Sequence, residues 1–317
     1  MLRFIVHRFL YVVPISLGVT LICFILTQMA PGDAASAVIP DDASPELAAE
    51  IRAAYGFDQP VPIQYLMWLG RVVTGDLGIS IATGRPVINE VLPAMANTLS
   101  LAAGAILLAA FFGILLGTLA AYRNGTFADR AISAIGIAGM SIPQYWLAMV
   151  MVVILSVEMG LFPASGRANP GSPFWTHLQH MILPMLTLAT VPAGIIARSV
   201  RSTVVETLQQ EFVQALAAKG VSGARLFLHV AKNAAGPALA VIGLQMANLL
   251  GGSILVETVF AWPGTGFLLN SAIFMRDLPV MQATVLVLAM FFILSNLAVD
   301  ILQMLFDPRV KRARRGG

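Results

Sequence analysis

Few residues of this chain have the types and spacing that covalent chemistry requires. It has four histidines, at positions 7, 177, 180 and 229, and one cysteine, Cys23. Neither Gly-x-Ser-x-Gly nor His-Glu-x-x-His occurs, so two common signatures of hydrolytic enzymes are missing. None of the three lysines, at 219, 232 and 311, lies in a Gly-Lys-Ser/Thr phosphate loop. We therefore expect no enzyme active site and no nucleotide site in this chain.

The remaining polar residues favour binding or packing over catalysis. His177 and His180 are three residues apart and offer two metal ligands, but without a third ligand we expect no metal site. Five polar residues lie in apolar surroundings, where they either line a transport pathway or form hydrogen bonds between helices, and the sequence leaves both alternatives open. They are Ser141, Gln144, Gln245, Asn248 and Ser253.

The elements that carry these residues are membrane-spanning helices. The chain is 58% hydrophobic and only 11% charged, against about 25% charged residues in a typical soluble domain. Crossing a hydrocarbon core takes about 20 apolar residues in a helix, and charges are excluded from its centre. Six runs meet this requirement and predict an all-α polytopic membrane protein with six crossings: 9–32, 91–122, 131–157, 168–197, 233–256 and 278–299.

The distribution of basic residues predicts the orientation. An even number of crossings places both termini on one side, and the segments on that side carry 14 Lys and Arg residues against five on the other. The positive-inside rule then makes both termini cytoplasmic. The alternative is that the first run is a cleaved signal peptide, but its charge-free stretch is longer than the apolar region of such peptides. The basic residues occupy short loops, which argues against a nucleic-acid site.

The largest outer region, 31–90, predicts a small helical cap. Ser44 and Pro45 are typical of a helix start, and this helix would end at Gly56. A second, amphipathic helix is expected over 63–73, ended by Gly75. The cap is either a solvated connection or a docking surface for a soluble partner. A further charge-free stretch, 258–275, contains Trp-Pro-Gly and is expected to be an outer loop that dips back into the protein.

The inner segment 198–237 predicts a cytoplasmic elbow between two spans. A helix is expected over 204–218, stopped at Lys219-Gly220, followed by a second short helix capped by Ser222. Within the spans, Gly113 and Gly117 form a G-x-x-x-G that predicts close helix packing. Pro143 and Pro192 predict kinks.

Several of these segments resemble one known family. The stretch 214–220 is similar to the inner loop, Glu-Ala-Ala, three residues, Gly, of the permease subunits of bacterial ABC importers, with Gln214 in place of Glu and Leu216 in place of the second Ala. Motifs along the whole chain resemble the B-type permease of dipeptide, oligopeptide and nickel importers. They are Pro31-Gly32-Asp33, Gly56-Phe57-Asp58-Gln59-Pro60, Gly75-Asp76-Leu77-Gly78, Leu161-Phe162-Pro163, Leu183-Pro184, Glu257-Thr258-Val259-Phe260, Trp262-Pro263-Gly264 and Asp307-Pro308-Arg309.

The resemblance implies the type I importer permease fold and a division of the chain into three parts. These are 1–93, the first span and the periplasmic cap; 94–305, the transmembrane core with the coupling loop 204–236; and 306–317, a basic cytoplasmic tail. In the family this loop fits into a cleft of an ATPase subunit. The coupling residues implied here are Gln214, Ala215, Ala218, Lys219, Gly220, Ser222, Arg225 and His229.

The function implied is that of a pore-forming subunit in the inner membrane, translocating di- or oligopeptides by alternating access. The partners implied are a C-type permease, one or two cytoplasmic ATPases that bind ATP and Mg, and a substrate-binding protein outside. Nickel complexes, glutathione, opines and oligosaccharides are alternative substrates. From physical reasoning alone, a secondary transporter or channel is the rival. Such proteins usually carry ionisable groups at mid-membrane depth, and only Asp300, off-centre, is a candidate here.

Overall fold

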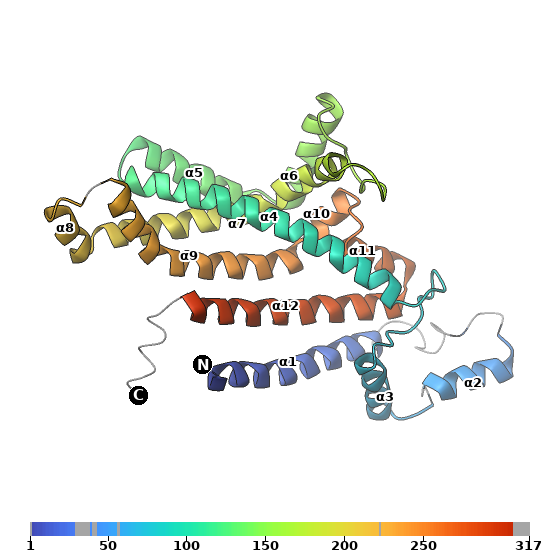
Figure 1. The fold of residues 1–317 in the computed structure, drawn as a ribbon. Coiled ribbons are helices and arrows are strands. Elements are labelled where there is room, and N and C mark those ends of the chain that lie inside the picture. Colours follow the sequence, from blue (N-terminus) through green and yellow to red (C-terminus); the bar gives the residue numbers. More distant parts are fainter. Residues whose placement is uncertain (1, 29–38, 40–42, 56–57, 222, 307–317) are drawn as a thin grey trace. The chain divides into compact units, whose positions relative to one another are not determined.

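The structure, a computed structural model, describes the chain apart from residues 1, 29–38, 40–42, 56–57, 222 and 307–317 (Figure 1). The described residues are mostly helical, with one isolated antiparallel bridge between Ile79 and Pro86. They divide into two compact units, residues 1–98 with 263–293 and residues 99–262 with 294–317. The first motif of the family resemblance, 31–33, and the basic tail from position 307 lie outside the described residues.

The first unit contains both chain segments that flank the predicted outer region. Its elements are α1 (Leu2–Gln28), α2 (Pro45–Tyr55), α3 (Val61–Val73), the start of α4 (Ile88–Tyr122), α11 (Thr265–Met275) and most of α12 (Leu278–Phe306). The two predicted helices of the cap are present, and α3 begins two residues earlier than predicted. Ser44 Oγ accepts a hydrogen bond from the Leu47 amide, as expected of the residue that precedes a helix.

A buried aspartate joins two distant segments of the first unit. Asp277, at the start of α12, is 2% exposed. Its Oδ2 accepts hydrogen bonds from Ser80 Oγ at 2.5 Å and from the Ala82 amide at 3.1 Å. Beside it, Val87 and Val91 pack with Ala283 in a small apolar core. These contacts fix the segment before α4 against the turn between α11 and α12.

The stretch 258–275 is more ordered than the predicted outer loop. The expected helix break at Trp262-Pro263-Gly264 is present, because α10 (Ile254–Val259) ends before it and α11 begins at Thr265. The rest of the stretch is helical, where a loop was predicted. Thr265 is fully buried, and its amide donates to Thr98 Oγ1 at 2.8 Å. The buried hydrogen bonds explain why a segment rich in turn residues folds back inward.

The second unit is arranged around α7 (Phe174–Leu208), half of whose most apolar stretch is buried. It also contains the end of α4, α5 (Phe127–Ser141), α6 (Gln144–Met151), the π-helix η1 (Val152–Glu158), α8 (Glu211–Ala218), α9 (Ala224–Gly252) and α10. α7 contacts α5, α6, α8, α9 and α10. It is one continuous helix through Pro184 and Pro192, so the kink expected at Pro192 does not interrupt it.

Glycines allow the helices of this unit to approach closely. A Cβ at Gly117 would lie 2.5 Å from the Ala197 carbonyl oxygen, and one at Gly113 would lie 2.7 Å from the Ile196 side chain. A Cβ at Gly194 would lie 2.6 Å from the Gly136 carbonyl oxygen. α4 and α5 thus pack on α7 at distances that a side chain would prevent. The packing role predicted for Gly113 and Gly117 is confirmed.

The predicted third crossing is broken in the middle. α5 and the α6–η1 helix are bent by 99° relative to each other. The break falls at Ile142, which has extended backbone (φ −77°, ψ 126°), and at Pro143, which precedes α6. Proline disfavours the helical conformation of the residue before it, so α5 cannot continue past Ser141. Pro143 therefore reorients the chain far more than a kink does.

The candidate spans agree in part with the predicted crossings. Among the described residues, α4, α7, α9 and most of α12 are long and apolar enough to cross a membrane, and the bent α5–α6–η1 pair would be a fifth span. α1 is a 27-residue helix, and the part of it whose side chains are described, Leu10–Ile25, is apolar. Six crossings therefore remain a prediction, whereas the all-α membrane architecture is confirmed.

Candidate functional site

The predicted elbow is formed by the end of α7, by α8 and by the start of α9, and it lies at one end of the second unit (Figure 1). The single helix predicted over 204–218 is wrong, because the chain breaks at Gln209 and Gln210. Gln210 has extended backbone (φ −71°, ψ 145°). This break turns α8 away from α7 and lets Val213, 5% exposed, pack inward. The elbow is a short separate helix rather than an extension of the span.

Backbone hydrogen bonds close the turn after α8. Gly220 has φ +76°, a left-handed conformation that glycine adopts without strain. Its amide donates to the Ala217 carbonyl at 2.9 Å, and the Val221 amide donates to the Leu216 carbonyl at 3.0 Å. These two bonds form the Schellman arrangement that ends many helices. The predicted stop at Lys219-Gly220 is confirmed, and the glycine is what makes it possible.

The helix after the turn is longer than predicted. α9 begins at Ala224 and continues to Gly252, so the expected short helix is the first part of a 29-residue helix. Gly223 precedes it with φ 60° and ψ −130°, and no side chain caps the helix. Ser222, the predicted cap, lies outside the described residues. A push on this turn would act directly on the end of a predicted span.

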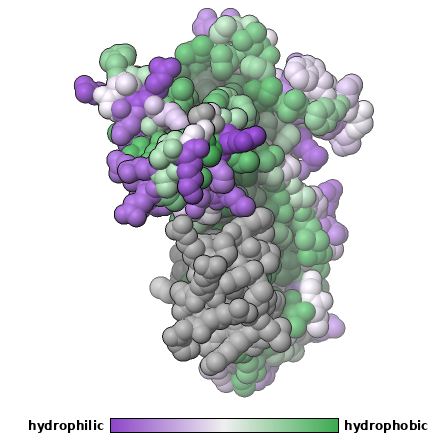
Figure 2. All heavy atoms as spheres, turned by 60° about the vertical axis from the view of Figure 1, so that its left-hand side comes forward, coloured by the Kyte–Doolittle hydropathy of each residue, from purple (hydrophilic) through white to green (hydrophobic). Residues whose placement is uncertain are grey.

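The surface of the elbow that faces away from the rest of its unit is exposed and carries basic residues. The predicted coupling residues that are described are all exposed: Gln214, Ala215, Ala218, Lys219, Gly220, Arg225 and His229. The positive charges Lys219, Arg225 and Lys232 lie on or beside the turn. Figure 2, which brings this end of the molecule forward, shows hydrophilic residues gathered there beside a largely hydrophobic surface. A small exposed helix with a basic turn is a suitable docking element for a partner subunit.

A cavity lies behind the elbow, where the first turns of α9 meet α4 and α7. It has a volume of about 290 Å³ and a mostly apolar lining that includes Tyr122, Val204 and Phe227. The rings of Tyr122 and Phe227 are 6.1 Å apart at their centroids. The space is open to the surface, since Tyr122 is 46% and Phe227 is 48% exposed. Among the described residues, no side chain fills this space between the start of α9 and α4.

The five predicted pathway residues are not brought together as one lining. Gln245 and Ser253 are buried, at 6% and 1% exposure, while Ser141 and Asn248 are exposed and Gln144 is half-buried. Ser253 Oγ donates to Glu257 Oε1 at 3.0 Å, and Ser141 Oγ donates to the Ile137 carbonyl at 2.9 Å. These two hydroxyls thus bond within their own chain region. The choice between lining a pathway and packing between helices stays open for all five residues.

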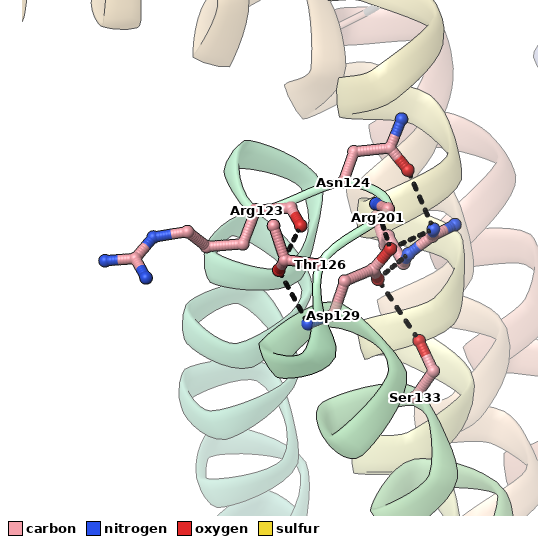
Figure 3. Close-up of polar contacts among 7 residues, drawn as sticks. Arg123, Asn124, Thr126, Asp129, Ser133 and Arg201 are labelled. Atoms are coloured by element: carbon pink, nitrogen blue, oxygen red, sulfur yellow. Dashed lines mark hydrogen bonds and ion pairs between the residues drawn. The ribbon is translucent and has the colours of Figure 1, made fainter.

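A second turn of this unit, between α4 and α5, contains a polar cluster that the sequence analysis did not single out (Figure 3). Asp129 is 3% exposed and accepts two hydrogen bonds from Arg201 of α7, at 2.5 Å to Oδ1 and 2.7 Å to Oδ2. Oδ2 also accepts from the Gly125 amide at 2.9 Å, and Arg201 donates to Asn124 Oδ1 at 3.1 Å. The side chain of Arg123 points away from the cluster. The bidentate pair fixes this turn to α7.

The sequence contains a signal for this cluster. Thr126 and Asp129 have the Thr-x-x-Asp spacing of a residue before a helix and an acidic residue in its first turn. Thr126 Oγ1 accepts from the Asp129 amide at 3.4 Å, so the local part of the signal is visible in the structure. The pairing with Arg201, 72 positions later, could not be read from local spacing.

The two outer histidines do not form a ligand cluster. His180 Nδ1 lies 2.8 Å from the Thr176 carbonyl oxygen of its own helix. In the part of the chain that the structure describes, no group of three His, Cys, Asp or Glu residues could hold a metal ion.

Two family models together match nearly the whole chain. Residues 113–312 match the binding-protein-dependent transport system inner membrane component, and residues 1–102 match the N-terminal part of such membrane components. The elbow and the Asp129 cluster both lie in the first of these ranges.

Curated relatives match the chain over its full length. The dipeptide transport system permease protein DppB of Alkalihalophilus pseudofirmus is 36% identical, covering 98% of this chain and all of the relative. DppB of Escherichia coli K12 is 37% identical over 99% of this chain and all of the relative. The metal-staphylopine import permease CntB of Staphylococcus aureus is 34% identical, over 99% of this chain and all of the relative.

A solved structure shares the fold. A chain of the MetNI methionine ABC transporter in an inward-facing conformation matches 70% of this chain and 98% of its own length, with a TM-score of 0.55 and 19% identity. This likeness bears on the fold alone and identifies it as that of a type I importer permease. With the family matches, the absence of a phosphate loop in the sequence is as expected for a transport subunit without its own ATPase site. The chain belongs to the inner membrane component family of binding-protein-dependent transport systems.

Proposed function

We propose that this chain is the pore-forming permease subunit of an ATP-driven importer of di- or oligopeptides. The observation that carries this proposal is the full-length similarity, at 36–37% identity, to permeases named for dipeptides. The metal-staphylopine permease at 34% identity keeps metal–staphylopine complexes as a second substrate class, and opines remain an alternative as well. Nickel complexes, glutathione and oligosaccharides are further alternatives within the same importer class.

This chain has no phosphate loop for ATP, so in the proposed complex other subunits hydrolyse ATP. The chain pairs with a C-type permease, with one or two cytoplasmic ATPases that bind ATP and Mg, and with an outer substrate-binding protein. The positive-inside distribution of 14 against five basic residues supports cytoplasmic termini and a cytoplasmic elbow. In this arrangement the basic exposed turn at Lys219 and Arg225 faces the ATPases.

The proposed mechanism is alternating access driven through the elbow. When the ATPases close, they push on α8 and its turn. Because α8 joins α7 through Gln209-Gln210 and α9 through residues 219–223, the push moves the ends of two long helices. The cavity of about 290 Å³ behind the start of α9 supports this motion, since it leaves space for α9 to move against α4.

The test is to co-purify the tagged chain with its neighbours in mild detergent and to reconstitute what is recovered. Recovery of a second permease and an ATPase, with ATP hydrolysis and dipeptide uptake stimulated by the binding protein, would support the proposal. Recovery of the chain alone, with uptake that follows the proton gradient, would favour a secondary transporter or channel instead.

Gly220→Pro tests the elbow within that complex. Proline has a φ near −65° and no amide hydrogen, so it cannot reproduce the φ of +76° or the bond to Ala217. We expect the variant to reach the membrane, to retain ATP hydrolysis and to lose uptake by about tenfold or more, which corresponds to at least 1.4 kcal/mol of lost coupling. Uptake at the parent rate would contradict the coupling role.

A further inference from the structure

α3 packs against the side of α1, the first predicted span, rather than beyond the end of that span. Tyr65 Oη lies 2.8 Å from Thr20 Oγ1, and Gln28 Nε2 donates to Gln64 Oε1 at 2.8 Å. The ring of Phe24 is 5.5 Å from that of Tyr65 and 5.9 Å from that of Trp68. Polar and aromatic side chains thus bind the middle of α3 to the last third of α1. In Figure 1, α3 lies at the end of α1 away from the N-terminus.

These contacts set the depth of α3 relative to the bilayer. Thr20 lies near the middle of the predicted first span, 9–32, and Gln28 lies toward its end. At 1.5 Å per residue, Thr20 lies about 12 Å deeper along α1 than Gln28. If α1 crosses the membrane, α3 therefore lies at the boundary of the hydrocarbon core, and the Tyr65 hydroxyl reaches below it. A cap standing in water could not make these contacts.

α3 carries apolar residues on the exposed side that a helix of a water-soluble protein keeps polar. The residues turned toward α1 or to its sides include Gln64, Tyr65 and Arg71, which are half-buried. The exposed residues of α3 are all apolar, Gly or Pro: Val61, Pro62, Ile63, Leu66, Met67, Gly70 and Val73. Leu66 is 64% exposed and Val73 is 80% exposed. Exposed faces in water are normally polar, so this face is made for an apolar surrounding.

The neighbouring helix α2 provides the contrast. It is of similar length and contacts α3, but it carries Glu46, Glu50 and Arg52 at exposed positions. α3 has Arg71 as its only charged residue. The two helices of one outer region therefore differ in the solvent to which they are suited.

We propose that α3 is an interfacial helix whose exposed face, formed by Ile63, Leu66, Met67 and Val73, is inserted among lipid acyl chains of the outer leaflet. Tyr65 and Trp68 lie where aromatic residues concentrate at membrane–water boundaries. Gln64 and Arg71, seven positions apart on one helix side, provide the polar edge toward the headgroups. Lipid is the occupant because α1, to which α3 is attached, itself exposes Leu21, Ile22 and Ile25 at the same depth.

In this arrangement α3 anchors α1 at a fixed depth in the membrane. A helix that lies in the boundary and is bonded to α1 resists vertical movement of α1, since displacement in either direction would expose apolar surface to water or bury polar groups. The inference depends on the chain spanning a membrane, which the family membership supports, and not on the substrate of the importer.

The experiment measures the depth of single spin labels in the assembled complex in lipid nanodiscs. In a Cys23→Ala background, labels are placed at Leu66→Cys and Met67→Cys on α3, and at Ala53→Cys on α2 as the matched control. Accessibility to oxygen, which partitions into lipid, is compared with accessibility to a water-soluble nickel chelate. We expect the oxygen-to-nickel ratio to be several-fold higher at positions 66 and 67 than at position 53.

Two results would overturn the proposal in different ways. A label at 66 that is as accessible to nickel as the one at 53 would mean that α3 faces water. A label that neither reagent reaches would mean that a partner protein covers the face. Using two positions on α3 guards against a single variant that fails to assemble, and uptake by each variant shows that the complex is intact.

Discussion

The α4–α5 turn and the α8–α9 turn belong to the same unit and look alike in sequence. Each contains a glycine with a left-handed backbone, φ +80° at Gly125 and +76° at Gly220, and each carries basic residues. They differ in what holds them. The first is bonded to α7 through the Asp129–Arg201 pair, whereas the second is closed by its own backbone bonds and exposes its side chains.

The difference indicates two tasks for turns of one kind. A turn fixed to the central helix keeps the ends of α4, α5 and α7 in register, so it gives the unit a rigid base. A turn that is closed by its own backbone hydrogen bonds leaves its exposed side chains available to another molecule. Such a turn can move as one rigid piece. The helix break at Gln209-Gln210 belongs to the second turn alone.

The largest effect is expected from Arg201→Ala, which removes the ion pair between Asp129 and Arg201, here called the brace. The buried Asp129 carboxylate would lose both of its side-chain nitrogen donors from α7, and a buried charge without its partner is destabilising. Removing one partner of a buried pair costs about 3–5 kcal/mol, and each 1 kcal/mol lowers the melting temperature of a 150–250-residue domain by roughly 2–4 °C. We therefore expect the melting temperature of the purified complex to fall by roughly 6 °C or more.

Arg123→Ala is the matched control, since it removes the same type of side chain from the α4–α5 turn, where that side chain points away from the cluster. The two variants should differ clearly in melting temperature. Equal melting temperatures would mean that the brace contributes nothing and that the contrast between the turns is not one of stability.

An intermediate effect is expected from Gly220→Ala, with Gly125→Ala as its control. A Cβ at either glycine has no atom within 4 Å, and both alanines would be forced into a left-handed conformation that costs about 1–2 kcal/mol. The two substitutions should therefore destabilise the protein similarly. If the elbow transmits the push, only Gly220→Ala should lower the number of substrate molecules imported per ATP hydrolysed. A similar loss in both variants would remove the functional distinction.

The smallest effect is expected from Thr126→Ala, which removes the hydroxyl that precedes α5. Such substitutions cost about 0.5–2 kcal/mol, and the long 3.4 Å bond to the Asp129 amide places this one at the lower end. Thermal unfolding should show a shift smaller than that of Arg201→Ala. A larger shift would mean that the Thr126 hydroxyl, and not the ion pair, holds the turn.

Much of this protein was predictable because its determinants are local. Charge-free runs, proline and glycine positions, and the Gly220 stop are properties of short segments, and they correctly predicted the all-α membrane class, α2, the end of α8 and the close packing at Gly113 and Gly117. The motif resemblance predicted the family, which two family models and full-length relatives then showed.

The tertiary structure decided what depends on partners far apart in the chain. The separation of α8 from α7 depends on where Val213 can be buried, and the 99° bend at Pro143 depends on the packing that receives α6. The pairing of Asp129 with Arg201 spans 72 positions, and the contact of Tyr65 with Thr20 spans 45. Residue types and spacing determine which helices form and where they end. Only the packed fold determines which polar groups find each other and which apolar faces stay exposed.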